Sequence, residues 1–317
     1  MRKFLIRAMI VLAALFVADR VVGLVMEHWL CRITTGVLGK DNYICDHCDE
    51  EVLVFGSSRT MMHYNAKMME EELGHTVYNC GGNGYGIILS YGRLLMISER
   101  YHPQLIVMEV TPEFDLVEYN DNLRDLGELK RHYDRKGVSG IFSDIEHTEK
   151  YKMMSYLYRY NSDFLHNPLR MISKKPFDRN NVGVQGFIPS DIDFDEMRVK
   201  EFQDDEKKPD PIKLSYLKRF VDLALKHSRL VFVVSPYWDG RDSGIFKPAR
   251  QLADSLGIPF LDFSNDPKYI HNDKYFRDGI HLNARGADVF TADLVRRLKD
   301  VMREDTRANI VISSIRK

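Results

Sequence analysis

Short apolar runs rich in β-branched residues alternate with helical patterns along most of this chain. The apolar runs, which we expect to be strands, cover residues 51–55, 76–79, 104–110, 230–234 and 259–263. The main amphipathic segments, which we expect to be helices, cover 60–73, 87–100, 213–227, 246–256 and 284–302. Such alternation is typical of a parallel sheet with helices on both faces. The sequence therefore predicts an α/β fold, a three-layer α/β/α sandwich around a five-stranded parallel sheet.

The first 30 residues are mainly apolar and follow a basic start. Residues 8–26 are apolar except for Asp19 and Arg20, and are long enough to span a bilayer. A charged pair inside such a span is costly unless it is paired or lies near an interface. Cleavage after the first apolar run would place Phe16 where a signal peptidase requires a small residue. We therefore expect 1–30 to be an uncleaved membrane anchor, with a cleaved signal peptide as the alternative.

The charges around this segment predict its orientation. Arg2, Lys3 and Arg7 precede the apolar run, and positive residues stay on the cytoplasmic side. The main domain is then expected outside the cytoplasm, in the periplasm or on the cell surface, with the membrane as one partner.

The rest of the chain divides by composition. We expect a linker over 31–50, a main domain over 51–303 and a tail over 304–317. The charged, tyrosine-rich stretch 116–211 interrupts the alternation, and a structureless loop of that length is implausible in a compact domain. It is expected to be an inserted helical cap over the carboxyl ends of the strands, ending in a linker at 204–211.

Charge and cysteine content exclude some classes of protein. The formal net charge is −1 over 317 residues, so no global attraction to nucleic acid is expected. Cys45 and Cys48 form a C-x-x-C motif without a second pair, which argues against a zinc ribbon. A disulfide among Cys31, Cys45 and Cys48 is open, and we interpret the motif as structural. No metal or organic cofactor is expected.

Three short stretches carry candidate chemistry. GSS at 56–58 follows the first strand, NCGGNGYG at 79–86 follows the second, and DGIH at 278–281 precedes the last helix. A serine hydroxyl is a poor nucleophile without a base, and a carboxylate three residues before a histidine can orient that base. Ser58 and His281 are therefore candidates for nucleophile and base, although a serine at this position also caps helices well.

In this order and context, the three stretches resemble the SGNH (GDSL-type) hydrolase superfamily. The resemblance covers about 51–113 and 229–303 and implies a flavodoxin-like sandwich and serine-dependent acyl transfer. It places Ser58 as nucleophile, His281 as general base and Asp278 as the residue that orients it.

The resemblance also implies an oxyanion hole, in which Gly81 N–H joins that of the nucleophile. The chain departs from the family pattern in two blocks. Ser57 replaces the usual aspartate, and Pro112 or Glu113 stands where an oxyanion asparagine is usual. We expect Asn83 or Arg59 to substitute for that donor. These features are similar to membrane-anchored relatives, namely alginate O-acetylation proteins and DltD-like proteins.

The sequence thus favours an esterase or O-acyltransferase that forms an acyl-enzyme on Ser58. Its expected substrate is an acylated cell-envelope carbohydrate or a small ester, with envelope proteins as further partners. The alternative is a catalytically impaired protein that binds a glycan or an envelope partner. A nucleotide-binding domain is disfavoured because neither glycine stretch has a phosphate-loop pattern. Trp238 is expected to stack on a sugar or to pack its loop, and His63 to be a surface or capping residue.

Overall fold

The five expected strands form one parallel sheet in the order β2-β1-β3-β4-β5. The computed structural model describes residues 1–119, 121–160, 175–196 and 207–315. The strands are β1 (Val52–Phe55), β2 (Val77–Asn79), β3 (Leu105–Glu109), β4 (Arg229–Val234) and β5 (Phe260–Asp262). The order reverses between β1 and β3, and open α/β sheets bind ligands at such a switch point, outside the carboxyl ends of the strands.

Helices cover both faces of the sheet, as the alternation predicts. Leu53 and Phe55 belong to the apolar core on one face, whereas Val52 and Val54 belong to the core on the other. The first core includes α5 (Ile87–Ser98), α11 (Pro211–Ala224) and α12 (Lys247–Leu256); the second includes α4 (Ala66–Leu73) and α13 (Ala284–Ile315). The three-layer α/β/α fold is therefore confirmed.

The helix expected over 60–73 is two helices, so this prediction is wrong in detail. The first, α3 (Ser58–His63), ends at Tyr64, whose backbone is extended. Asn65 then caps α4, its side-chain oxygen accepting from Met68 N–H at 3.1 Å. An asparagine that offers the backbone this alternative partner favours a new helix start over continuation.

The segment expected as a linker, 31–50, is instead packed into the domain. It contains α2 (Gly36–Asn42) and a π-helical turn, η1 (Tyr43–His47). Buried Asp41 in α2 accepts from both guanidinium nitrogens Nε and Nη2 of Arg93 in α5, at 2.8 and 2.6 Å. All four cysteines are free thiols, and Cys31 is the one that is exposed.

The insertion contains short helices. Three of them, α6 (Pro112–Asp115), α7 (Asn122–Leu129) and α8 (Val138–Ile145), contact α5, while η2 (Lys130–His132) contacts α7 and α9 (Glu149–Lys152) contacts α8. The insertion also reaches the carboxyl edge of the sheet through an extended segment, where Ile188 N–H donates to Met61 O at 2.9 Å. A helical cap was expected there. Residues 161–174 and 197–206, including the start of the expected linker at 204–211, lie outside the described residues.

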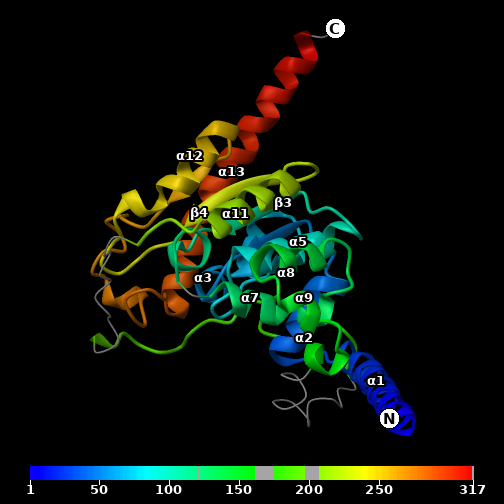
Figure 1. Cartoon of the computed structure of the whole chain (residues 1–317). Coiled ribbons are helices and arrows are strands. Elements are labelled where there is room, and N and C mark those ends of the chain that lie inside the picture. The colour runs from blue at the N-terminus through cyan, green and yellow to red at the C-terminus, as the bar shows by residue number, and fades with distance from the viewer. Residues whose placement is uncertain (120, 161–174, 197–206, 316–317) are drawn as a thin grey trace.

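Two long helices project from opposite ends of the molecule (Figure 1). Helix α1 (Arg2–Leu30) is, among the described residues, the one helix long and apolar enough to cross a membrane, a test that a signal sequence also passes. Its Asp19 accepts from the backbone N–H groups of Tyr156 and Leu157 at 2.9 and 3.1 Å. At the other end, α13 continues to Ile315 and replaces most of the expected tail.

Lys40 in α2 links the N-terminal segment to the sheet edge. Its ammonium group is buried and donates to Gly81 O at 2.6 Å and to Gly186 O at 2.7 Å. Burial lowers the pKa of Lys40 from 10.5 to about 7. Between these values the folded protein holds a neutral amine while the unfolded chain is protonated, so unfolding takes up a proton.

We predict that the stability of the wild type rises relative to that of Lys40→Met as pH increases from about 7 to about 10. The expected slope is up to about 1.4 kcal/mol per pH unit, since unfolding takes up one proton in this window. Urea unfolding of both proteins at several pH values measures it. The matched control is Lys218→Met, which removes an exposed lysine paired with Asp222. Parallel pH curves for wild type and Lys40→Met would contradict the prediction.

Candidate active site

A sharp turn delivers Ser58 to the carboxyl edge of the sheet. Gly56 follows β1 with φ +141°, and a Cβ there would lie 2.3 Å from Thr60 Oγ1. Only glycine tolerates both this backbone conformation and this contact. Ser57 is the residue that caps α3, accepting from Arg59 N–H at 3.4 Å. Ser58 is therefore left as the first residue of the helix, half-buried at the switch point.

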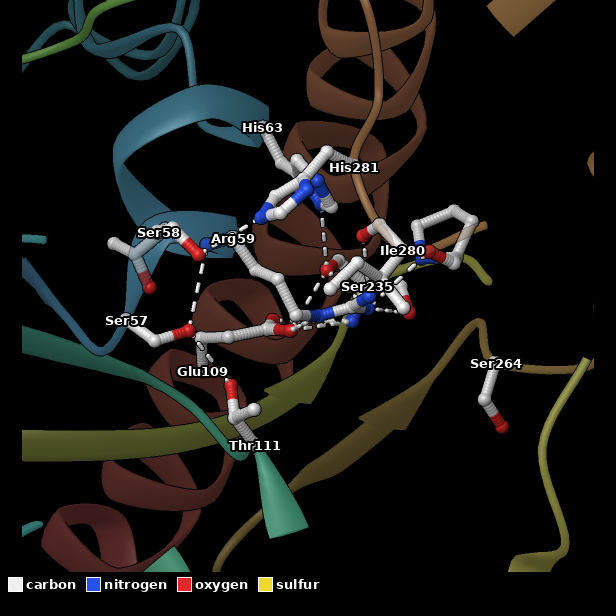
Figure 2. Close-up of polar contacts among 12 residues, drawn as sticks. Ser57, Ser58, Arg59, His63, Glu109, Thr111, Ser235, Ser264, Ile280 and His281 are labelled. Carbon is white, nitrogen blue, oxygen red and sulfur yellow. Dashed lines mark hydrogen bonds and ion pairs between the residues drawn. The ribbon is translucent and has the colours of Figure 1, made fainter. Parts of the chain in front are cut away.

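The structure brings Ser58, His281 and Asp278 into one chain of hydrogen bonds. Ser58 Oγ lies 2.9 Å from His281 Nε2, although the two residues are 223 positions apart (Figure 2). His281 Nδ1 lies 3.0 Å from both carboxylate oxygens of Asp278. Asp278 Oδ1 also accepts from the N–H groups of Ile280 and His281, at 3.0 and 2.8 Å, so the carboxylate fixes the turn as well as the ring.

These contacts define where the protons lie. Burial alone would raise the pKa of Asp278, but the hydrogen bond and charge of His281 and the two backbone N–H groups hold it below 3.8. Asp278 is therefore an acceptor only, and His281 Nδ1 carries a proton. In the neutral imidazole, Nε2 is then the acceptor that faces Ser58, the arrangement that a general base requires.

Arg59 points into the protein, not toward the Ser58 hydroxyl (Figure 2). Its Nε donates to Glu109 Oε1 at 3.0 Å, its Nη1 to Ile280 O at 2.8 Å and its Nη2 to Ser235 O at 2.6 Å. The guanidinium also stacks over the Tyr237 ring at 3.6 Å. The expectation that Arg59 supplies an oxyanion donor is therefore wrong, because its donors are already bound to these groups.

Glu109, at the end of β3, is the buried partner of Arg59. Its carboxylate also accepts from the backbone N–H and the hydroxyl of Ser235, at 3.0 and 2.7 Å, and from the Tyr64 hydroxyl. Sequence reasoning gave Glu109 no role. The sequence did contain one signal for this role: Glu109 ends an otherwise apolar strand, and a charge buried at such a position needs partners.

His63 is fully buried, so its assignment as a surface or capping residue is wrong. Its Nε2 accepts from Leu282 N–H at 2.9 Å, and its Nδ1 lies 2.8 Å from Ser235 Oγ. Burial, together with the charges of Arg59 and His281, lowers the pKa of His63 well below 6.5. His63 is therefore neutral, and sequence spacing alone gave no sign of these partners.

The glycine turn after β2 does not present the expected oxyanion donor. Gly81 N–H donates to Asn79 Oδ1 at 3.0 Å, so it is already paired. A Cβ on Gly81 would lie 2.5 Å from Met61 N, and the glycine is therefore explained by close packing against α3. Asn83 is exposed in the same turn, and no hydrogen bond among the described residues joins it to Ser58. Ser58 N–H, as the first of α3, has no intrahelical partner, and no hydrogen bond among the described residues engages it.

Residues 111–113, which follow β3 where the family usually has an oxyanion asparagine, make contacts of a different kind. Glu113 pairs with Arg241 and lies 3.8 Å from Lys207 Nζ. Thr111 Oγ1 lies 3.0 Å from Ser57 Oγ. This hydrogen bond joins the stretch after β3 to the stretch after β1, the two stretches that depart from the family pattern. Neither Pro112 nor Glu113 supplies a side-chain donor like that of asparagine.

Trp238 packs its loop, the second of the two outcomes expected for it. Its ring stacks on Phe194 with centroids 5.2 Å apart, and its Nε1 donates to Asp273 Oδ1 at 2.8 Å. A surface cavity of about 530 Å³ adjoins this pair, lined among others by Phe194, Asp193, Asp273, Asn283 and Arg285. Asn283 lines this cavity, whereas Ser58, Asp278 and His281 do not.

One group of side chains with metal-ligating atoms was found among the described residues, and it does not fit a cation. Asp41, Cys45 and His132 place ligand atoms within 4.8 Å of one another. The Asp41 carboxylate is bound by the guanidinium groups of Arg93 and Arg131. Two cations on the same carboxylate would repel a metal ion, and this cluster is explained as a buried ion-pair network.

Comparisons with known proteins give only distant similarity. No family model and no curated protein matches the chain. Among solved structures, a GDSL-like lipase from Bacteroides thetaiotaomicron shares 11% identity, with 79% of this chain and 88% of that chain covered and a TM-score of 0.38. A Bacteroides fragilis protein proposed to be an acylhydrolase shares 13%, with coverages of 78% and 86% and a TM-score of 0.36.

We predict that Glu109→Gln lowers the free energy of unfolding by about 3–5 kcal/mol, because it leaves the Arg59 charge buried without its partner. Chemical denaturation measures the loss. Asp222→Asn is the matched control, since it breaks the exposed Lys218–Asp222 pair and should cost no more than about 0.5 kcal/mol. Equal effects of the two substitutions would show that the buried pair is not required for stability.

Proposed function

We propose that this protein is a serine-dependent esterase or O-acyltransferase. The observation that carries the proposal is the continuous chain Ser58–His281–Asp278, in which His281 Nε2 lies 2.9 Å from Ser58 Oγ and His281 Nδ1 lies 3.0 Å from both Asp278 carboxylate oxygens. Nothing in this arrangement calls for a metal or an organic cofactor.

The proposed reaction has two halves. Ser58 Oγ attacks the carbonyl carbon of an acyl ester while His281 Nε2 takes the hydroxyl proton, and Asp278 stabilises the imidazolium that forms. The tetrahedral intermediate then expels the alcohol, which receives the proton from Nε2, and the acyl group remains on Ser58. Water or a sugar hydroxyl attacks in the second half, through the same base, and gives hydrolysis or transfer.

The oxyanion hole supports a modest rate. Ser58 N–H is one candidate backbone donor, whereas Gly81 N–H is paired with Asn79 Oδ1. Loss of one oxyanion donor typically costs about a hundred- to a thousandfold in rate. This feature favours the second candidate, a protein that binds an acylated glycan or an envelope partner without turning it over.

We propose a carbohydrate ester as the substrate. The cavity beside Phe194 carries the carboxylates of Asp193 and Asp273, which can accept from hydroxyls, next to the aromatic ring of Phe194. A few polar groups next to an aromatic wall is the usual composition of a small-molecule site. The glycan and the acyl group are not specified by these residues.

We further propose that α1 is a retained membrane anchor and that the main domain lies outside the cytoplasm. The domain uses α1 as part of its own structure. Asp19 accepts from Tyr156 and Leu157 N–H, and a Cβ on Gly23 would lie 2.2 Å from Tyr156 Cβ. A signal peptide that is removed by cleavage would not contribute contacts to the folded domain, so these contacts favour a retained helix.

We predict that a fluorophosphonate forms one covalent adduct, on Ser58, in the full-length protein. Ser58→Ala and His281→Ala should lose the adduct and lower p-nitrophenyl ester hydrolysis by at least about 10⁴-fold. Ser57→Ala is the matched control: it removes the neighbouring hydroxyl and a helix cap, and should retain the adduct at a cost of about 1 kcal/mol in stability. Intact mass and peptide mapping identify the site.

An absence of adduct in the folded wild type would contradict the esterase proposal and favour the binding protein. Glycan affinity that is equal in wild type and Ser58→Ala would support that second candidate.

We predict that the protein purified from cell membranes retains its N-terminal residues and resists extraction by alkaline carbonate. Intact mass and N-terminal sequencing provide the measurement. Removal of residues 2–18 should release the domain into the soluble fraction, because the remaining apolar stretch is too short to span a bilayer. A wild-type chain that begins after the apolar run would show that α1 is a cleaved signal.

A further inference from the structure

Helix α3 carries more of the site than the nucleophile. Arg59 and His63 are four positions apart, so they lie on the same face of the helix. Both side chains are buried and both reach the loop that carries His281 (Figure 2). The helix that presents Ser58 thus also contacts the loop of the base.

The two contacts lie on either side of His281. On one side, Arg59 Nη1 donates to Ile280 O at 2.8 Å. On the other, Leu282 N–H donates to His63 Nε2 at 2.9 Å. The backbone of residues 280–282 is therefore bound at two points, one through a carbonyl and one through an N–H.

The direction of each hydrogen bond through His63 follows from its partners. A backbone N–H can only donate, so His63 Nε2 is the acceptor and Nδ1 carries the proton. Nδ1–H then donates to Ser235 Oγ at 2.8 Å, and Ser235 Oγ–H donates to Glu109 Oε1 at 2.7 Å. The carboxylate of Glu109 thus orients the whole chain, and it binds Arg59 as well.

We propose that Arg59 and His63 are positioning residues that clamp the His281 loop against α3. The inference rests on the proposed esterase or acyltransferase function. Neither residue touches the reacting atoms. The clamp holds His281 Nε2 on the Ser58 hydroxyl, and a misplacement of about 1 Å at such a site costs about a hundredfold in rate.

The identity of residue 63 matters for charge as well as for shape. The rings of His63 and His281 are 6.3 Å apart and nearly perpendicular. A cation at residue 63 would oppose the imidazolium that forms on His281 during attack. A neutral imidazole supplies the acceptor for Leu282 N–H without that repulsion.

The test compares three variants of the full-length protein. His63→Leu removes both ring contacts, His63→Gln keeps an acceptor near the Nε2 position, and Tyr269→Phe is a control that removes a buried hydrogen bond to Asp293. With p-nitrophenyl acetate, His63→Leu should lower kcat by about 10- to 100-fold with little change in KM. His63→Gln should recover most of this loss, and Tyr269→Phe should match the wild type. A folded His63→Leu variant with wild-type kcat would overturn the clamp.

A spectroscopic measurement separates the clamp from the proposed function. In protein labelled with ¹⁵N-histidine, the wild type and His63→Gln should show His281 protonated at Nδ1, and His63→Leu should show a mixture of tautomers. An unchanged His281 tautomer in His63→Leu would overturn the clamp. If the wild type fails to react with the fluorophosphonate, the proposed function fails and this spectrum alone decides on the clamp.

Discussion

The buried ion pair between Arg59 and Glu109 is the interaction on which the site depends. The two side chains are 2% and 0% exposed, so their desolvation must be offset by well-placed partners. Those partners come from separate elements: Ser235 follows β4, Tyr64 ends α3 and Ile280 lies in the His281 loop. One pair of charges therefore joins the carboxyl ends of neighbouring strands to the loop that carries the base.

The fold was predictable because its signal is local and repeated. Each apolar run and each amphipathic segment reports its own secondary structure, and their alternation leaves few arrangements other than a parallel sheet. The contact between Ser58 and His281 was reached differently, from a resemblance in the order of short motifs. The hydrogen bonds show the two residues in contact, while their catalytic roles remain a proposal.

The remaining parts of the site could not be predicted, because their partners are distant in sequence. Nothing local distinguishes His63 from a surface histidine, since its donor Leu282 N–H and its acceptor Ser235 Oγ lie 219 and 172 positions away. Gly81 was expected as an oxyanion donor, but its glycine is required by the approach of Met61 N. The packing of 31–50 also depends on tertiary contacts, which outweigh local propensity.

The burial of Lys40 under Gly81 and Gly186 has a mechanical consequence. Both elements between α1 and β1 are bound to the domain: α2 through Lys40 and Asp41, and η1 through buried Ile44 and Cys45. If α1 holds the protein in a bilayer, the domain would be connected to the membrane rigidly and not through a flexible linker. The distance of Ser58 from the membrane and its orientation would then be fixed by the fold. Its substrates would be limited to esters that lie at that distance.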